Sequence, residues 1–200
     1  LSPRSAGHQS LLESKRILAQ ELWSGFIPVE FSLVETDLSA AELPPPYYVN
    51  ISRYSYVSAA AEDVVAFFRR YAVDLSAQVW FSYLGTPVKT NLPIGCLFDM
   101  FGCGECAPPL PWRLQIHFQF FPLDRVIACC TRADAERYYF HSLKQCLFVL
   151  YGNLRGYSQI KLDDQAALWT GLLDGDRLGC DSVLRGVVEE RQDVRRIPVR

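Results

Sequence analysis

The amino-acid sequence predicts an α+β protein in which a small sheet comes first and a helical region follows. Two alternating segments, over residues 26–34 and about 47–53, precede one amphipathic helical segment, and three more short strand segments come after it. Beyond about residue 122 the alternation gives way to helical spacing. With 50% hydrophobic residues in a chain of 200, a real core can be buried.

One helix and two strands are predicted at the N-terminal end. Over residues 10–23, apolar residues recur at helical spacing, and Gly25 ends the segment. The strand over residues 26–34 follows, and a run of three prolines separates it from the strand that begins at Tyr47. We expect residues 1–24 to form an N-terminal tail and helix.

A single amphipathic helix is predicted over residues 61–71. Its early acidic pair, Glu62 and Asp63, suits the positive end of a helix dipole. The residues expected to face inward are Val64, Val65, Phe67, Phe68 and Tyr71.

The rest of the sheet is predicted from three strands and a second, short helix. The strands lie over residues 79–84, just after the turn at 85–87, and over 112–121, with the helix over 94–101. One helix covering one face of a mixed sheet is the arrangement that a ubiquitin-like β-grasp requires. We therefore expect a β-grasp domain over residues 25–122.

Residues 123–193 are expected to be helical. Thr131 and Asp134 have the spacing of a capping box, which opens a long helix that carries Lys144. Asp163 is expected to cap a second helix that runs through Trp169, and a third is expected within residues 175–188.

Lys144 is the candidate functional residue, because it is the only lysine in a largely apolar helix. Phe140 and Phe148 lie one turn on either side of it, with Leu147 and Tyr151 near the same stripe. Crowding by carbon disfavours the ammonium and raises the fraction of free amine, the form that attacks a thioester. The alternative is a lysine stem that lies along apolar surface with its head in water.

The sequence resembles the autophagy protein 5 family over most of its length from residue 22 onward. The lysine helix is similar to the one that carries the family's acceptor lysine, and other stretches match in order. These are residues 22–28 (LWSGFIP), 46–49 (PYYV), 79–89 (VWFSYLGTPVK), 92–99 (LPIGCLFD), 110–118 (LPWRLQIHF), 168–172 (LWTGL) and 195–199 (RRIPV).

This resemblance implies a scaffold rather than an enzyme. Lys144 would accept the ubiquitin-like autophagy protein 12 through an isopeptide bond formed with E2-like conjugating enzymes. With the coiled-coil autophagy protein 16, the conjugate would promote lipidation of a second ubiquitin-like protein at the preautophagosomal membrane. Candidate partner contacts are Leu22, Trp23 and Phe26, and residues 194–200 would open a second ubiquitin-like domain that is truncated in this chain.

Two rival readings use other features. One is a β-grasp interaction module that binds in the same pathway without a covalent bond. The other is a small zinc protein using Cys103 and Cys106, which have the spacing of a metal hook, completed by further ligands. Those further ligands are Cys129 and Cys130 with His117 or His141. The loop position of the hook favours free thiols over a metal site, and we expect no cofactor.

Charge and patterning exclude several classes. A net charge of -2 and a pI near 5.9 give no general attraction to nucleic acid. No apolar run is long enough to cross a bilayer and the first residues do not resemble a signal peptide, so we expect a cytoplasmic protein with reduced cysteines. The motifs of serine hydrolases, P-loop proteins, dinucleotide-binding folds and zinc proteases are absent.

Overall fold

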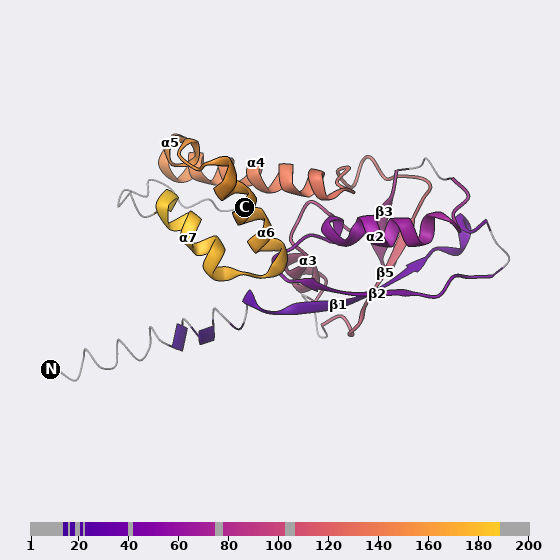
Figure 1. Ribbon diagram of the computed structural model, residues 1–200. Helices are drawn as coiled ribbons and strands as arrows, with labels where there is room; N and C mark the ends of the chain where they lie inside the picture. Colours follow the sequence, from indigo (N-terminus) through magenta and orange to yellow (C-terminus); the bar gives the residue numbers. More distant parts are fainter. Residues whose placement is uncertain are drawn as a thin grey trace.

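The computed structural model describes residues 14–15, 17–18, 21, 23–39, 42–74, 78–102 and 107–188. A sheet with one helix across it forms one part of the molecule, and four helices pack beside it as the other (Figure 1). The described positions of the helix predicted over residues 10–23 are helical, and its other positions lie outside the described residues. The α+β architecture predicted from the sequence is confirmed.

Five strands form one mixed sheet in the order β2-β1-β5-β3-β4. Strand β1 is antiparallel to β2 and parallel to β5, and β3 is antiparallel to both β5 and β4. The strands are β1 (Phe26–Leu33), β2 (Tyr47–Ser52), β3 (Trp80–Tyr83), β4 (Thr86–Pro87) and β5 (Trp112–His117). A first strand lying between the second and the last is the ubiquitin-like arrangement that the order of elements predicted.

Helix α2 (Val57–Arg69) covers one face of the sheet (Figure 1). It begins four residues earlier than predicted, because its first turn is itself buried, with Val57 and Ala61 fully enclosed. Glu62 and Asp63 therefore lie beyond the first turn and not at the positive end of the dipole, so that prediction was wrong. The inward face was predicted well, with Val64 and Phe68 buried and the other three residues partly buried.

The short helix α3 (Ile94–Phe101) has the predicted bounds. Gly95 lets it approach the end of β2, since a Cβ there would lie 2.7 Å from the carbonyl oxygen of Arg53. The Gly95 N–H donates to that same carbonyl at 2.8 Å. A glycine is therefore required at this position by the close contact and not by its backbone angles.

Strand β5 ends at His117, whereas the sequence predicted alternation to residue 121. The cause is Asp37, whose buried carboxylate accepts the N–H groups of Phe118 at 2.5 Å and Gln119 at 3.1 Å. These donors are thereby diverted from the sheet, and Phe120 follows with a φ of 53°. A carboxylate outside the strands thus decides where the last strand stops.

Four helices form the second part of the molecule, α4 (Arg132–Tyr151), α5 (Arg155–Ser158), α6 (Leu162–Asp174) and α7 (Arg177–Val188). The predicted capping box opens α4, with Thr131 and Asp134 bonded reciprocally. Asp163 does not cap α6, because the cap position is Lys161 and Asp163 lies inside the first turn. There its charge still complements the positive helix end.

A cluster of aromatic and small residues joins the helical region to the sheet domain. Tyr56, just before α2, lies with its ring centroid 6.0 Å from that of Trp169 on α6, and Tyr139 of α4 lies 5.9 Å from Trp169. Burial raises the pKa of Tyr56 to about 12, as expected for a hydroxyl removed from water. The helices are therefore packed onto the sheet domain through a core of their own.

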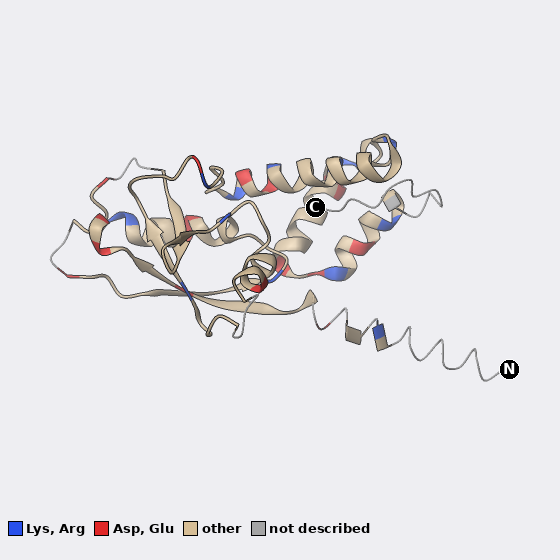
Figure 2. Ribbon diagram, turned by 180° about the vertical axis from the view of Figure 1, so that it is seen from behind, with Lys and Arg blue, Asp and Glu red and all other residues tan. Residues whose placement is uncertain are grey.

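Charged residues are distributed without a dominant sign. Figure 2 shows basic and acidic positions interspersed along α4 and α7. Within the described part of the chain, no helix is long and apolar enough to cross a membrane.

Replacing Asp37 by alanine tests whether its carboxylate stabilises the chain at the end of β5. Asp37 is only 1% exposed, so its loss leaves two backbone N–H groups without a partner in a place that water reaches poorly. We expect the free energy of unfolding to fall by about 2–4 kcal/mol in urea titrations. Glu35→Ala, an exposed change in the same turn, is the matched control and should stay within about 0.5 kcal/mol. Equal losses in the two variants would contradict the role of Asp37.

His117 gives a pH-dependent prediction. Its ring stacks on Trp80 with centroids 3.8 Å apart, and its Nε2 lies 2.7 Å from Ser82 Oγ. Burial lowers the pKa of His117 below its usual 6.5, with the charge of Asp37 opposing this. As the pH is lowered, His117 therefore binds a proton in the unfolded chain before it does so in the folded chain. The stability contributed by the neutral ring is fully present above about pH 6.5 and falls as the pH drops below that value.

Replacing His117 by glutamine should remove this part of the pH dependence. The free energy of unfolding of each protein is measured in urea at pH 7.5 and pH 5.5. We expect wild type to lose more stability than the variant when the pH is lowered. An equal loss of stability in the two proteins would show that the pKa of His117 does not differ between the folded and unfolded states.

Candidate functional site

Lys144 lies on the second half of α4, beside a stripe that packs into the helical region. Phe140, Leu147 and Tyr151 from this stripe are buried, and Lys144 itself is half-buried. Its Nζ lies 4.7 Å from the ring centroid of Tyr157 on α5. The amine therefore rests on an aromatic face and does not extend freely into water.

The two aromatic residues one turn from Lys144 differ in burial. Phe140 is buried, whereas Phe148 is 56% exposed, and the amine itself contacts the Tyr157 ring. The negative face of an aromatic ring stabilises an ammonium group. The contact with the Tyr157 ring thus gives the amine a defined position beside α5.

The turn after α4 places Tyr157 under the lysine. Helix α4 ends at Gly152, whose φ of 71° is accessible to glycine without strain. The Asn153 side chain then donates to the Tyr151 carbonyl at 3.1 Å and accepts the Arg155 N–H at 3.1 Å. At the other end, the Tyr157 hydroxyl donates to Gln165 Oε1 of α6 at 3.4 Å. Sequence reasoning missed Tyr157, because its contact depends on this turn and not on helical spacing.

The other three lysines have different surroundings. Lys15, Lys89 and Lys161 are all exposed, and Lys144 is the one half-buried lysine of the chain's four. Surface lysines of this kind are well hydrated and mobile. Among the lysines, an ordered and partly enclosed amine therefore occurs at Lys144 alone.

The three residues predicted to contact a partner differ in burial and in their neighbours. Leu22 lies outside the described residues. Trp23 is half-buried and stacks on Tyr54 with centroids 4.1 Å apart, and its indole N–H is buried without a hydrogen-bond partner among the described residues. Phe26 is 54% exposed at the start of β1. Trp23 therefore contacts Tyr54, whereas Lys144 contacts Tyr157.

The candidate zinc ligands are not assembled where they are described. Cys103 and Cys106 lie outside the described residues. Cys129 Sγ lies 3.8 Å from Ser58 Oγ, and the Cys130 thiol donates to the Val79 carbonyl at 2.5 Å. Burial raises the pKa of both thiols, to about 11 for Cys130, which disfavours the thiolate that a metal requires. No cluster of three or more metal-binding side chains occurs among the described residues.

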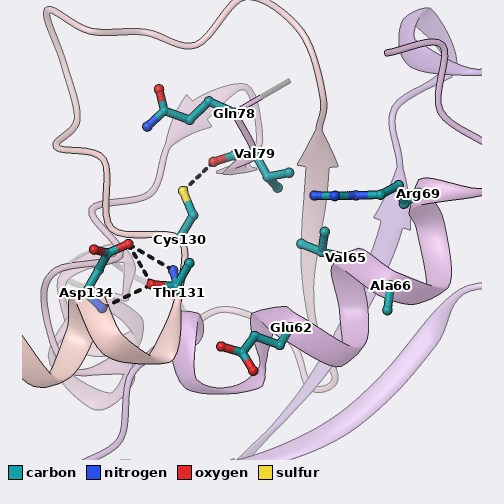
Figure 3. Close-up of a pocket in the computed structure, with 9 residues that line it drawn as sticks. All are labelled: Glu62, Val65, Ala66, Arg69, Gln78, Val79, Cys130, Thr131 and Asp134. Atoms are coloured by element: carbon teal, nitrogen blue, oxygen red, sulfur yellow. Dashed lines mark hydrogen bonds between the residues drawn. The ribbon is translucent and has the colours of Figure 1, made fainter. Parts of the chain in front are cut away.

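A hollow of about 500 Å³ lies where α2, the chain before β3 and the start of α4 meet (Figure 3). Val65, Ala66 and Val79 give it an apolar floor. Its polar groups are largely satisfied, because Asp134 bonds Thr131 and the Glu62 carboxylate accepts the Arg132 N–H at 3.4 Å. The positive end of α4 is thus neutralised by the protein's own carboxylates, and no nucleophile and base are paired here.

Comparison with known proteins agrees with this architecture. Residues 22–118 match the UblA domain of autophagy protein ATG5, and residues 132–179 match the alpha-helical bundle region of the same protein. The crystal structure of Kluyveromyces marxianus Atg5 superposes with a TM-score of 0.71 at 20% identity, over 84% of this chain and 67% of that one. That likeness shows the ubiquitin-like α+β fold.

Relatives from plants and fungi carry the name autophagy protein 5. The Arabidopsis thaliana protein is 31% identical over 78% of this chain and 45% of its own length, and the Oryza sativa subsp. japonica protein is 31% identical over 79% and 41%. The Penicillium rubens protein is 25% identical over 92% and 63%. The chain thus spans less than half the length of these plant relatives. Two regions of one family, matched in order and covering the sheet domain and the helices, show that this chain belongs to the autophagy protein 5 family.

Proposed function

We propose that this chain is a scaffold of autophagy whose Lys144 accepts the C-terminal carboxyl group of the ubiquitin-like autophagy protein 12. Membership of the family supports the pathway, and the surroundings of Lys144 support the choice of residue. The observation that carries the choice is the half-buried amine held 4.7 Å from the Tyr157 ring, while the other three lysines are exposed. An amine with restricted positions presents itself to an incoming carbonyl in a reproducible geometry.

The proposed reaction is an acyl transfer to nitrogen. Lys144 Nζ, after losing a proton, attacks the carbonyl carbon of a thioester between the ubiquitin-like protein and a cysteine of an E2-like conjugating enzyme. The C–S bond breaks as the amide C–N bond forms, the leaving thiolate takes up a proton, and the amine nitrogen loses its second one. The first deprotonation is assigned to a general base of the conjugating enzyme.

The wider role belongs to the conjugate. With the coiled-coil autophagy protein 16 it would promote transfer of a second ubiquitin-like protein to lipid, acting from the cytoplasm on the preautophagosomal or isolation membrane. The chain itself is proposed to hold the partners and to carry out no chemistry. Trp23, Phe26 and Leu22 remain the proposed contacts for the coiled coil.

A non-covalent role in the same pathway is the second candidate. The observation that favours it is the sheet domain itself, which has a core of its own and exposes Phe26 at the start of β1. In that case the β-grasp domain would bind its ubiquitin-like partner without a bond to Lys144.

Intact-mass measurement of the chain decides between the two. The chain is incubated with ATP, the activating and E2-like conjugating enzymes and the ubiquitin-like partner from one source. We expect a mass gain of one partner minus one water, absent in Lys144→Arg and retained in the matched control Lys161→Arg. A gain that survives Lys144→Arg would place the acceptor elsewhere, and no gain with enzymes shown to be active on a relative would favour the non-covalent role.

Tyr157 gives a graded prediction for the same assay. Tyr157→Leu removes the aromatic face under Lys144, and the less restricted amine is expected to be conjugated at a roughly two- to fivefold lower rate. Tyr157→Phe keeps the ring and should react at the wild-type rate. Equal rates in the leucine and phenylalanine variants would show that the ring does not position the amine.

A further inference from the structure

We propose that the hollow between α2 and the start of α4 binds the C-terminal end of a partner protein, whose terminal carboxylate pairs with Arg69. The hollow measures about 500 Å³ and lies where α2, the chain before β3 and α4 meet (Figure 3). This volume is within the usual range of ligand-binding pockets. Lys144 does not line the hollow, and the inference does not depend on conjugation there.

The polar groups in the wall formed by the start of α4 are already bonded within the protein. The Cys130 thiol donates to the Val79 carbonyl at 2.5 Å. The Thr131 hydroxyl and the Asp134 carboxylate bond each other in the capping box, with their oxygens 2.7 Å apart. A ligand would have to displace these bonds to use the same groups, so this wall does not select the ligand by hydrogen bonding.

Arg69, the last residue of α2, brings an unpaired charge to the hollow. Figure 3 shows its side chain extended across the apolar floor. Among the described residues, no ion pair includes it. Gln78, on the wall before β3, is exposed, and its amide likewise has no partner in the described part of the chain. A guanidinium binds a carboxylate by two parallel hydrogen bonds and an amide complements a peptide group, so this pair suits the end of a polypeptide.

The charges of the hollow have opposite signs at its two ends. Glu62 and Arg69 lie seven residues apart on one side of α2, which corresponds to about 10 Å along the helix axis. The Glu62 carboxylate accepts the Arg132 N–H at 3.4 Å, so it stands near Asp134 at the start of α4. Two carboxylates at this end repel an anion and attract a cation. The ligand therefore carries one negative charge, at the Arg69 end, which excludes polyanions such as nucleic acids.

An extended polypeptide matches this spacing of charges. Its residues advance by about 3.3 Å each, so about three residues separate the two ends of the hollow. A lysine or arginine three positions before the C-terminal residue would therefore lie near Glu62 while the terminal carboxylate meets Arg69. Between these ends the floor is apolar, formed by Val65, Ala66 and Val79. Because alternate side chains of an extended chain face the same way, we expect apolar residues at the last and third-last positions.

The open form of the hollow favours the end of a chain over a free carboxylic acid. Four of its lining residues, Glu62, Arg69, Gln78 and Thr131, are exposed. Sites for small molecules usually enclose most of the ligand surface, roughly 70–90% of it. A hollow lined by exposed residues leaves more of a small acid in water, whereas a chain end needs an opening through which the rest of its protein continues.

Fluorescence polarisation of the full chain with labelled peptides tests the proposal. The probe is a pool of hexapeptides that carry rhodamine at the N-terminus and a free carboxylate at the C-terminus. Leu, Val or Phe occupies the last and third-last positions, lysine the fourth-last, and serine or glycine the others. We expect binders from this pool to lose at least tenfold in affinity when the C-terminal carboxylate is converted to an amide.

Arg69→Gln is the critical variant, and the amidated peptide completes a double-mutant cycle with it. We expect the variant to bind the free-acid peptide at least tenfold more weakly than wild type, and amidation to have no further effect in it. Arg70→Gln is the matched control, because the Arg70 guanidinium lies over the Phe67 and Tyr71 rings and does not line the hollow. It should bind both peptides as wild type does.

Two further variants test the acidic end and the floor. Glu62→Gln should weaken peptides that have lysine at the fourth-last position and leave those with serine there unchanged. Ala66→Phe fills part of the floor and should weaken all binders at least tenfold. Ala66 is exposed, so we expect the variant to keep the circular dichroism of wild type. Should it unfold, the cycle at Arg69 decides alone.

Several results would overturn the proposal. These are a pool that yields no binder, an amidated peptide that binds as tightly as the free acid, and an equal effect of amidation in wild type and Arg69→Gln. A loss in Arg70→Gln as large as that in Arg69→Gln would reduce the binding to a general effect of charge. Displacement of the peptide by N-acetylleucine or decanoate as readily as by unlabelled peptide would assign the hollow to a small carboxylic acid.

Discussion

The central position of β1 is the constraint on which the rest of the structure depends. This strand bonds β2 on one side and β5 on the other, and its alternate residues Ile27, Val29, Phe31 and Leu33 are buried beneath α2. A shift of one residue would turn all four toward solvent. At roughly 1.5–3 kcal/mol for each buried side chain of this size, such a shift is prohibited. The register of β1 thereby fixes the positions of the strands on both its sides.

From this fixed sheet, the position of the lysine follows through a chain of contacts. The residue before α2, Tyr56, contacts Trp169, and Trp169 contacts Tyr139 on α4. Helix α4 then carries Lys144 and ends at Gly152, and the turn returns α5 beneath it. The Lys144 amine is thus oriented by packing that begins in the sheet domain. Helices on a flexible tether would not give it a defined position.

The sequence determined much of the fold and less of the site, for physical reasons. Alternation and helical spacing reflect burial on one face, so β1, α3 and the capping box of α4 were predicted at or near their bounds. The end of β5 was missed because Asp37 is 81 positions away along the chain from Phe118. Tyr157 was missed for a similar reason, since a turn and not a periodicity brings it to Lys144. The start of α2 was missed because small residues at positions 58–60 resemble a loop in composition, although Val57 and Ser58 are buried.

The contact between Lys144 and Tyr157 also has an entropic consequence. A lysine on an open surface samples many rotamers, and fixing it costs up to about 2 kcal/mol. Lys144 loses part of that rotamer freedom on folding, because its amine rests on the Tyr157 ring. The hydroxyl of Tyr157 is in turn hydrogen-bonded to Gln165 of α6. A bond formed at this nitrogen would therefore order less additional chain than a bond at Lys15, Lys89 or Lys161. In the conjugate, a carboxyl terminus joined at Lys144 would have a narrower range of orientations than one joined at an exposed lysine.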